Sequence, residues 1–163
     1  MNPKTQQLQI RVTPEEKKTL KRLAHEAGQG VSSYVLSRVL PPAGAQFTEI
    51  LRRLARNEDA RFALAELNDL LVDLAPVQFG IVLEDAALCG VSPYHQNYVA
   101  AMVELAAERK EVPPPSWTSE VRPLEEPRFA VQMASLRSYL LRASPVAFKR
   151  RNIFIDSSVG DRV

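Results

Sequence analysis

The chain has 163 residues, of which 45% are hydrophobic, with a formal net charge of +2 and a single cysteine. This length suits one large domain or two small ones with a real hydrophobic core. One cysteine excludes an internal disulfide framework and indicates a reducing compartment. The first ten residues are too polar for a signal peptide, and no apolar run approaches the ~20 residues of a membrane span. We therefore expect a cytoplasmic protein.

The charge is distributed unevenly along the chain. Up to Leu40 there are seven Lys/Arg and three Asp/Glu residues, a net charge of +4, whereas the remainder carries fourteen and sixteen, a net charge of −2. A basic amino-terminal region on a mildly acidic body favours contact with nucleic acid at one end only. The alternative is chance clustering of basic residues on solvated helix faces.

Residues 7–12 alternate between polar and apolar side chains, as a half-buried β-strand does. The apolar face would carry Leu8, Ile10 and Val12, and the polar face Gln7, Gln9 and Arg11. A single strand leaves its backbone donors and acceptors unpaired, so the simplest arrangement pairs it with the same strand of a second copy. Such a ribbon would present Gln and Arg, side chains that read adenine and guanine in a major groove.

Two helices are expected to follow this strand. Thr13 is a good N-cap, Pro14 suits the first helical position, and Glu16 completes a capping box. The Gly-rich turn at residues 28–30 would end this first helix, because glycine tolerates a left-handed C-terminal position. A second apolar helix would then begin at Val31 and stop at two consecutive prolines, residues 41 and 42.

This strand, capped helix, Gly-rich turn and second helix resemble the ribbon–helix–helix family of dimeric DNA-binding proteins over roughly the first quarter of the chain. The family reads the major groove with its two-stranded ribbon. The resemblance implies that Gln7, Gln9 and Arg11 read bases, and that the helix start at Val31, Ser32 and Ser33 clamps a phosphate. Lys4 is expected to contact backbone phosphate. Gly30 departs from the family pattern, in which serine commonly caps the second helix.

Two alternatives to this interpretation stay open. The strand and two helices would also suit part of an ordinary hydrophobic core. In addition, some ribbon–helix–helix folds serve only as dimerisation platforms, so DNA contact is a separate expectation from the fold.

After a hinge at residues 41–46, the apolar spacing predicts a helical domain over residues 47–143, so the whole chain is expected to be mainly α with a ribbon–helix–helix domain over residues 1–42. Helices are predicted from Phe47 to Leu54, from Phe62 to about Ala75, from Tyr94 to about Lys110, and from Phe129 to Leu140. Residues 77–90 could form a short helix or a buried strand. Residues 112–127 hold five prolines and should be irregular, with Trp117 as a packing anchor rather than a ligand platform.

The sequence offers little evidence of catalysis. Two histidines and one cysteine far apart in the chain argue against a metal site, and the Gly-rich phosphate-binding fingerprints are missing. We expect His95 to be a surface or capping residue and Cys89 to be a small buried side chain. Glu104 and Glu108 should form a solvated helix face. The predicted protein is not an enzyme and uses no cofactor or metal.

Residues 144–163 are expected to form an extended C-terminal tail that mixes aromatic, basic and aliphatic side chains. Such a tail can dock on another protein by strand addition. The predicted partner contacts are Phe148, Lys149, Arg150, Arg151 and Phe154. The alternative is an ordinary C-terminal strand that packs on its own domain.

A ribbon–helix–helix module joined to a partner-binding region resembles the antitoxin of a type II toxin–antitoxin pair. The segment from Ser144 to Phe154 also looks like that of bacterial proteins encoded beside nucleotidyltransferase-like toxins. These resemblances imply a homodimeric autorepressor that binds operator DNA and neutralises a toxin protein. Two other functions stay open: a structural or partition protein, and a transcriptional regulator whose helical domain senses a small molecule. The sensor would need an apolar pocket with a few convergent polar groups.

Overall fold

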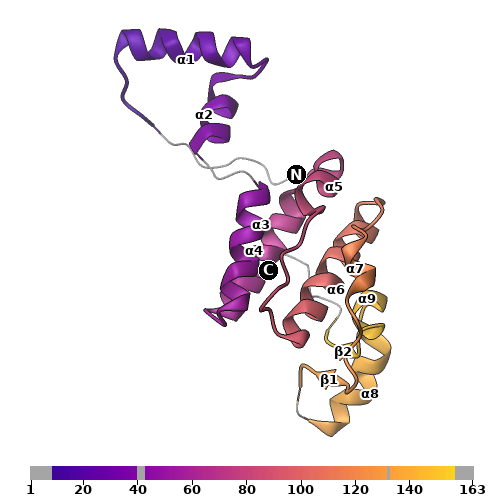
Figure 1. Cartoon of the computed structure of the whole chain (residues 1–163). Helices are drawn as coiled ribbons and strands as arrows, with labels where there is room; N and C mark the ends of the chain where they lie inside the picture. Colours follow the sequence, from indigo (N-terminus) through magenta and orange to yellow (C-terminus); the bar gives the residue numbers. More distant parts are fainter. Residues whose placement is uncertain (1–8, 40–42, 132, 157–163) are drawn as a thin grey trace. The chain divides into compact units, whose positions relative to one another are not determined.

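The computed structural model describes residues 9–39, 43–131 and 133–156 and is mainly helical (Figure 1). The chain divides into two compact units, an amino-terminal unit (residues 1–45) and a carboxy-terminal unit (residues 46–163). The elements are α1 (Pro14–Glu26), α2 (Val31–Val39), α3 (Ala43–Ala55), α4 (Ala60–Asp73), α5 (Pro76–Leu83), α6 (Pro93–Arg109), α7 (Trp117–Glu120), β1 (Arg128–Phe129), α8 (Ala134–Ala143), α9 (Val146–Lys149) and β2 (Ile153–Phe154). No helix within the described ranges combines the length and apolar character that crossing a membrane requires.

The first helix begins and ends as its sequence predicts. The hydroxyl of Thr13 accepts from the Glu16 N–H at 3.3 Å, and the Glu16 carboxylate accepts from the Thr13 N–H at 2.8 Å. These two bonds form the predicted capping box, with Pro14 in the first turn. After α1 the chain turns at Gly28, whose φ of 64° is a left-handed conformation that favours glycine. The predicted start and stop of α1 are therefore confirmed.

The hinge predicted over residues 41–46 is wrong from Ala43 onward. Residues 43–46 form the first turn of α3, while residues 40–42 lie outside the described part of the chain. Alanine and glutamine are strong helix formers, and one glycine among them costs only about 1 kcal/mol. Because the following residues bury a face at Phe47, Ile50 and Leu51, the helix extends back into the predicted hinge.

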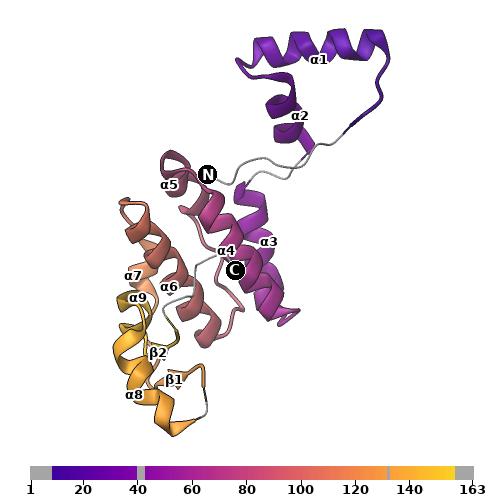
Figure 2. The same cartoon turned by 180° about the vertical axis from the view of Figure 1, so that it is seen from behind.

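Helix α6 is the centre of the carboxy-terminal unit. It packs against α4 on one side and against α7 and α9 on another, as opposite views show (Figures 1 and 2). Five consecutive residues from Val99 to Val103 are buried, which requires neighbours around most of the helix. The predicted helix from Tyr94 to about Lys110 is confirmed. The ambiguous stretch from residue 77 contains α5 and then an irregular connection to α6.

The Pro-rich stretch that follows α6 is held by a tryptophan. Trp117 is 9% exposed, its indole N–H donates to the Leu83 carbonyl at 2.8 Å, and its ring lies 6.5 Å from that of Phe47. One side chain therefore fixes the loop to the end of α5 and to α3. The prediction that Trp117 anchors the loop by packing is confirmed.

The C-terminal segment forms part of the core. Ile153 and Phe154 pair in parallel with Arg128 and Phe129, so the possible strand predicted here is confirmed. Phe129 was expected to start the last helix, and this is wrong: it belongs to β1, its ring stacks on that of Phe154 at 4.8 Å, and α8 starts only at Ala134. Residues 146–149 are helical, so the prediction of a continuously extended tail is also wrong.

Arg151 lies at the junction of these segments and is 5% exposed. Its Nη2 atom donates to the Glu104 carboxylate at 2.5 Å and to the Thr118 carbonyl at 2.6 Å, and its Nη1 donates to the Val121 carbonyl at 3.3 Å. The guanidinium therefore joins α6, the Pro-rich loop and the C-terminal segment. Glu104 was predicted to lie on a solvated face together with Glu108; Glu108 is exposed, but Glu104 forms this partly buried ion pair.

We expect Arg151→Ala to destabilise the protein strongly, by roughly 3–5 kcal/mol, because it leaves the Glu104 carboxylate partly buried and unpaired. The free energy of unfolding from urea titration measures this loss. Arg150→Ala is the matched control, because its exposed side chain should change stability by no more than about 0.5 kcal/mol. Equal stabilities of the two variants would contradict the structural role of Arg151.

The capping box predicts an acid-sensitive start of α1. The hydrogen bond from the Thr13 N–H, assisted by the Thr13 hydroxyl, lowers the pKa of Glu16 from its ordinary value of 4.5. The stabilisation of the helix start is thus fully present above pH 4.5 and is lost as the pH falls through the lower folded value. The amide proton shift of Thr13, followed by NMR, should titrate with a midpoint below 4.5. Glu16→Gln should abolish this titration and Glu15→Gln should preserve it; a midpoint at or above the ordinary value would contradict the capping interaction.

Candidate nucleic-acid interface

The segment before α1 exposes alternating polar and apolar side chains. Ile10 is 62% and Val12 42% exposed, and Gln9 and Arg11 are exposed beside them. Residues 9–12 form no strand in the single chain, and the one sheet among the described residues is the β1–β2 pair. Of the strand predicted over residues 7–12, the described part, residues 9–12, does not form a strand within one copy. Lys4 and Gln7, also predicted to contact DNA, lie outside the described residues.

Helices α1 and α2, which follow this segment, pack against each other. Ala24 is 1% exposed, and Leu20 and Leu23 are half-buried along the same side of α1. The outer side of α1 carries the exposed lysines Lys17, Lys18 and Lys21. Residues 9–39 include six Lys/Arg and three Glu residues, so this region has a net charge of +3. Its surface is suited to an anionic partner.

The start of α2 is accessible. Val31 is 38% exposed, and Ser32 and Ser33 are also exposed in the first turn. The first helix-type bond here runs from the Tyr34 N–H to the Gly30 carbonyl at 2.9 Å. The N–H groups of the preceding residues have no carbonyl partner within a helix, and the positive end of the helix dipole lies among them. The predicted phosphate clamp is therefore exposed and contains suitable donors.

Two further residues that the sequence analysis singled out, His95 and Cys89, lie in the carboxy-terminal unit. His95 is half-buried; its N–H donates to the hydroxyl of the N-cap Ser92 at 3.3 Å, and burial lowers the pKa of its imidazole. It is a residue of the α6 cap, as predicted. Cys89 is exposed, so the prediction that it is buried is wrong. It lies after α5 in an irregular segment, so the apolar residues around it are not aligned on one buried face of a helix. No group of three or more His, Cys, Asp or Glu suited to a metal occurs within the described ranges.

The tail residues predicted to contact a partner are not gathered on one surface. Phe148 is fully buried and its ring lies edge-on to Tyr98 at 5.2 Å, while Arg151 and Phe154 are also buried. Lys149 is half-buried and donates to the Arg142 carbonyl at 2.8 Å, which leaves Arg150 as the exposed member. Docking through Phe148, Arg151 and Phe154 is therefore wrong, because these side chains complete the core of their own unit. The structure follows the alternative that this segment packs on its own domain.

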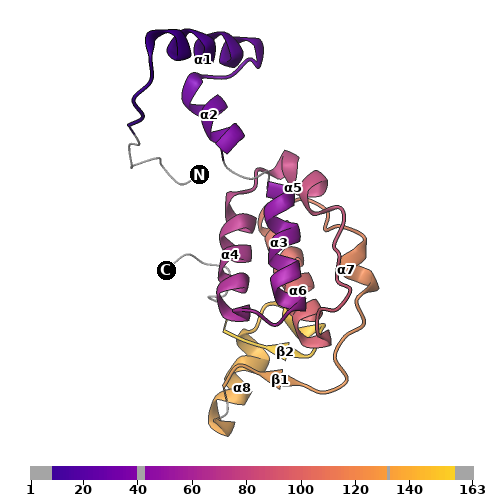
Figure 3. The same cartoon turned by 60° about the vertical axis from the view of Figure 1, so that its left-hand side comes forward.

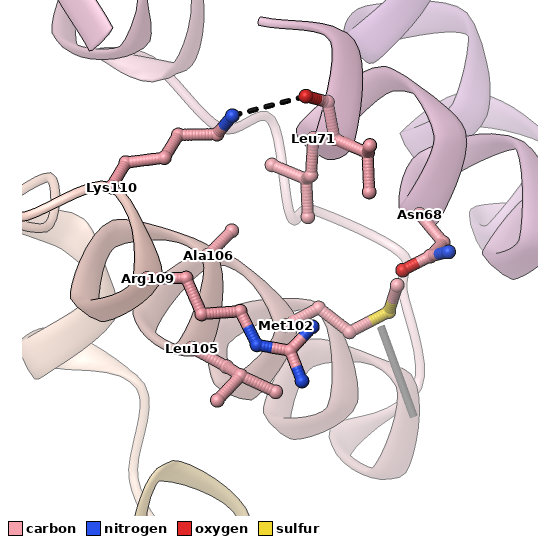
Figure 4. Close-up of a pocket in the computed structure, with 8 residues that line it drawn as sticks. Asn68, Leu71, Met102, Leu105, Ala106, Arg109 and Lys110 are labelled. Carbon is pink, nitrogen blue, oxygen red and sulfur yellow. Dashed lines mark hydrogen bonds between the residues drawn. The ribbon is translucent and has the colours of Figure 1, made fainter. Parts of the chain in front are cut away.

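A pocket of about 270 Å³ lies between α4 and α6 (Figure 4). Its lining residues are Asn68, Leu71, Val72, Met102, Leu105, Ala106, Arg109 and Lys110. The Lys110 ammonium group reaches across to α4 and donates to the Val72 carbonyl at 3.0 Å. This volume is slightly smaller than that of typical small-molecule sites, which start at about 300 Å³.

Residues 2–57 match the family model of NikA-like proteins, described as mobilization protein NikA. This is a DNA-binding family of the ribbon–helix–helix type that belongs to the relaxosome. The match covers about a third of the chain, comprising nearly all of the amino-terminal unit and the whole of α3. No curated protein and no solved structure matches the chain significantly. The comparison thus indicates DNA binding by the amino-terminal region.

Proposed function

We propose that this protein is a homodimeric, sequence-specific DNA-binding protein whose opening segments pair into a two-stranded antiparallel ribbon. The observation that supports this most strongly is the exposure of Ile10 and Val12 directly before an independently capped helix. Pairing with a second copy would satisfy the backbone groups of both segments and cover this apolar face on the helices. Gln9 and Arg11 would then point away from the helices because side chains alternate along a strand.

In the proposed complex the ribbon enters the major groove. Arg11 would donate to guanine, and Gln7 and Gln9 would pair with adenine. Phosphates on either side would be held by the start of α2, through Ser32, Ser33 and the N–H of Val31, and by Lys4. Because the two copies are related by a two-fold axis, the preferred DNA site would be palindromic. This binding requires neither catalysis nor a cofactor.

Two cellular roles are compatible with such a dimer, both expected in the cytoplasm. The name of the matching family favours a role in mobilization, in which the dimer would mark a DNA site for other proteins. The second role is that of an antitoxin that represses its own operon and neutralises a toxin. Residues other than Phe148, Arg151 and Phe154 would then have to bind the toxin, because those three are buried.

A ligand-responsive regulator is the alternative that the pocket between α4 and α6 supports. Apolar side chains of Leu71, Met102 and Leu105 and the polar groups of Asn68 and Lys110 line one space, as a sensor requires. Its small volume makes this function second to the proposed one.

The base-reading role predicts the effect of Arg11→Ala. With a duplex selected by the wild-type protein from a random library, this change should weaken specific binding by roughly 1–3 kcal/mol and relax the preference for guanine. Arg22→Ala is the matched control, because it removes the same charge from the outer part of α1, where Arg22 pairs with Glu26 at 2.8 Å. Unchanged affinity of Arg11→Ala, measured by fluorescence anisotropy, would contradict base reading by Arg11.

The ribbon itself is tested by Ile10→Asp. A carboxylate on the apolar face would be buried without a partner in the paired ribbon, so the dimer should dissociate and specific DNA binding should be lost. Gln9→Asp introduces the same charge on the opposite face and should leave the protein dimeric. Analytical ultracentrifugation measures both. A wild-type protein that stays monomeric at all concentrations tested would overturn the proposal.

A further inference from the structure

We propose that the surface around α8 is a docking site for an acidic, amphipathic segment of a partner protein. We call it the α8 surface and define it by Met133, Leu136, Tyr139, Arg142, Val146 and Arg150. The inference goes beyond the proposed DNA-binding function, because it concerns the carboxy-terminal unit alone and holds whether or not the amino-terminal unit binds DNA. In two views α8 lies at one end of its unit, beside β1 and β2 (Figures 1 and 3).

The α8 surface exposes large apolar side chains in a regular row. Met133, Leu136 and Tyr139 are 65%, 41% and 48% exposed and follow one another at intervals of three residues. Residues three apart are neighbours on a helix surface, so Leu136, Tyr139 and Arg142 follow an oblique strip around α8, with Met133 at its N-cap. Val146, 53% exposed, adds apolar area after the C-terminal end of α8. Such a concentration of exposed apolar side chains is typical of an interaction site.

The charge of this region is mainly basic, with the Asp156 carboxylate that accepts from the Tyr139 hydroxyl as an acidic neighbour. The stretch from residue 127 to residue 155 contains six Lys/Arg residues and no Asp or Glu. Arg151 is neutralised in the interior by Glu104, but Arg142 and Arg150 remain at the surface with Arg137, whose guanidinium lies 5.2 Å above the Phe129 ring. Complementary charge therefore requires an anionic partner, and the apolar strip requires one that also offers apolar groups.

The apolar groups are mainly aliphatic, and this favours a protein over a nucleic acid. Single-stranded nucleic acids are bound on aromatic platforms, and phosphates offer nothing that covers leucine, methionine or valine. An acidic amphipathic helix satisfies both requirements, because its apolar side chains pack on the strip while its carboxylates reach the arginines.

The α8 surface is held in position by contacts within the single chain. Leu140 is 3% exposed and attaches α8 to the core. The Ser144 hydroxyl accepts from the Ile155 N–H at 2.9 Å, and the Tyr139 hydroxyl donates to Asp156 at 3.2 Å. These contacts connect the middle and the C-terminal end of α8 to the C-terminal segment. Docking on a rigid helix loses little conformational entropy, which favours binding.

The test uses the full chain and a designed helical peptide with Leu at positions i, i+3 and i+7 and Glu at most others. We expect the labelled peptide to bind in fluorescence anisotropy, with an affinity that falls as salt is raised. Leu136→Ser together with Tyr139→Ser should weaken binding by about tenfold or more. The matched control, Ile81→Ser on α5, removes an aliphatic side chain that is 78% exposed and should have no effect.

The contribution of charge is tested by Arg142→Glu, which should weaken peptide binding several-fold. The matched control is Arg61→Glu, which makes the same change at an exposed position on α4 and should leave peptide binding unchanged. A peptide with every Glu replaced by Lys should not bind. A circular dichroism spectrum and a thermal unfolding midpoint equal to those of the wild type would show that the variants are folded. Absence of binding at millimolar peptide would overturn the proposal. The proposal would also be overturned if Arg142→Glu bound single-stranded DNA or phosphatidylglycerol vesicles more weakly than the wild type does but bound the peptide equally well.

Discussion

The carboxy-terminal unit depends on one buried guanidinium. Arg151 donates to a carboxylate of α6 and to carbonyl groups of the Pro-rich loop, so it connects three segments far apart in sequence. Removing an arginine from water costs several kcal/mol, and this cost is offset only where most of its donors find acceptors. Loop carbonyls are well suited to this, because a stretch rich in proline has few backbone N–H groups with which to pair them.

Two asparagine side chains also donate hydrogen bonds to carbonyl groups of this loop. Asn97 is buried on α6, and its amide donates to the carbonyls of Pro93 and Arg122 at 2.9 and 3.0 Å. Asn152 has a φ of 57° and donates to the Leu124 carbonyl at 2.6 Å. Together with Arg151 these side chains hold residues 118–124 against the helices. An irregular loop is thereby ordered by side chains rather than by its own backbone bonds.

The two units differ in how completely each one covers its own apolar groups. The carboxy-terminal unit uses its last described segment to complete its core, which is why Phe148 and Phe154 are unavailable to a partner. The amino-terminal unit caps and packs its helices but leaves Ile10 and Val12 in water. Among the exposed apolar features of the described residues, we propose a second copy as the partner of this opening segment and an acidic protein as the partner of the α8 surface.

Features that depend on local interactions were predictable from the amino-acid sequence alone. The Thr13–Glu16 capping box, the left-handed turn at Gly28, the extent of α6 and the anchoring role of Trp117 could all be predicted, because caps, glycine turns and apolar spacing act within a few residues. The family match over residues 2–57 agrees with the DNA-binding character inferred from the same segment. Only the tertiary structure decided which faces are covered. Arg150 and Arg151 are adjacent and chemically identical, yet one is exposed and the other buried against Glu104. Burial is set by contacts between residues as far apart as 104 and 151, and no local pattern encodes them.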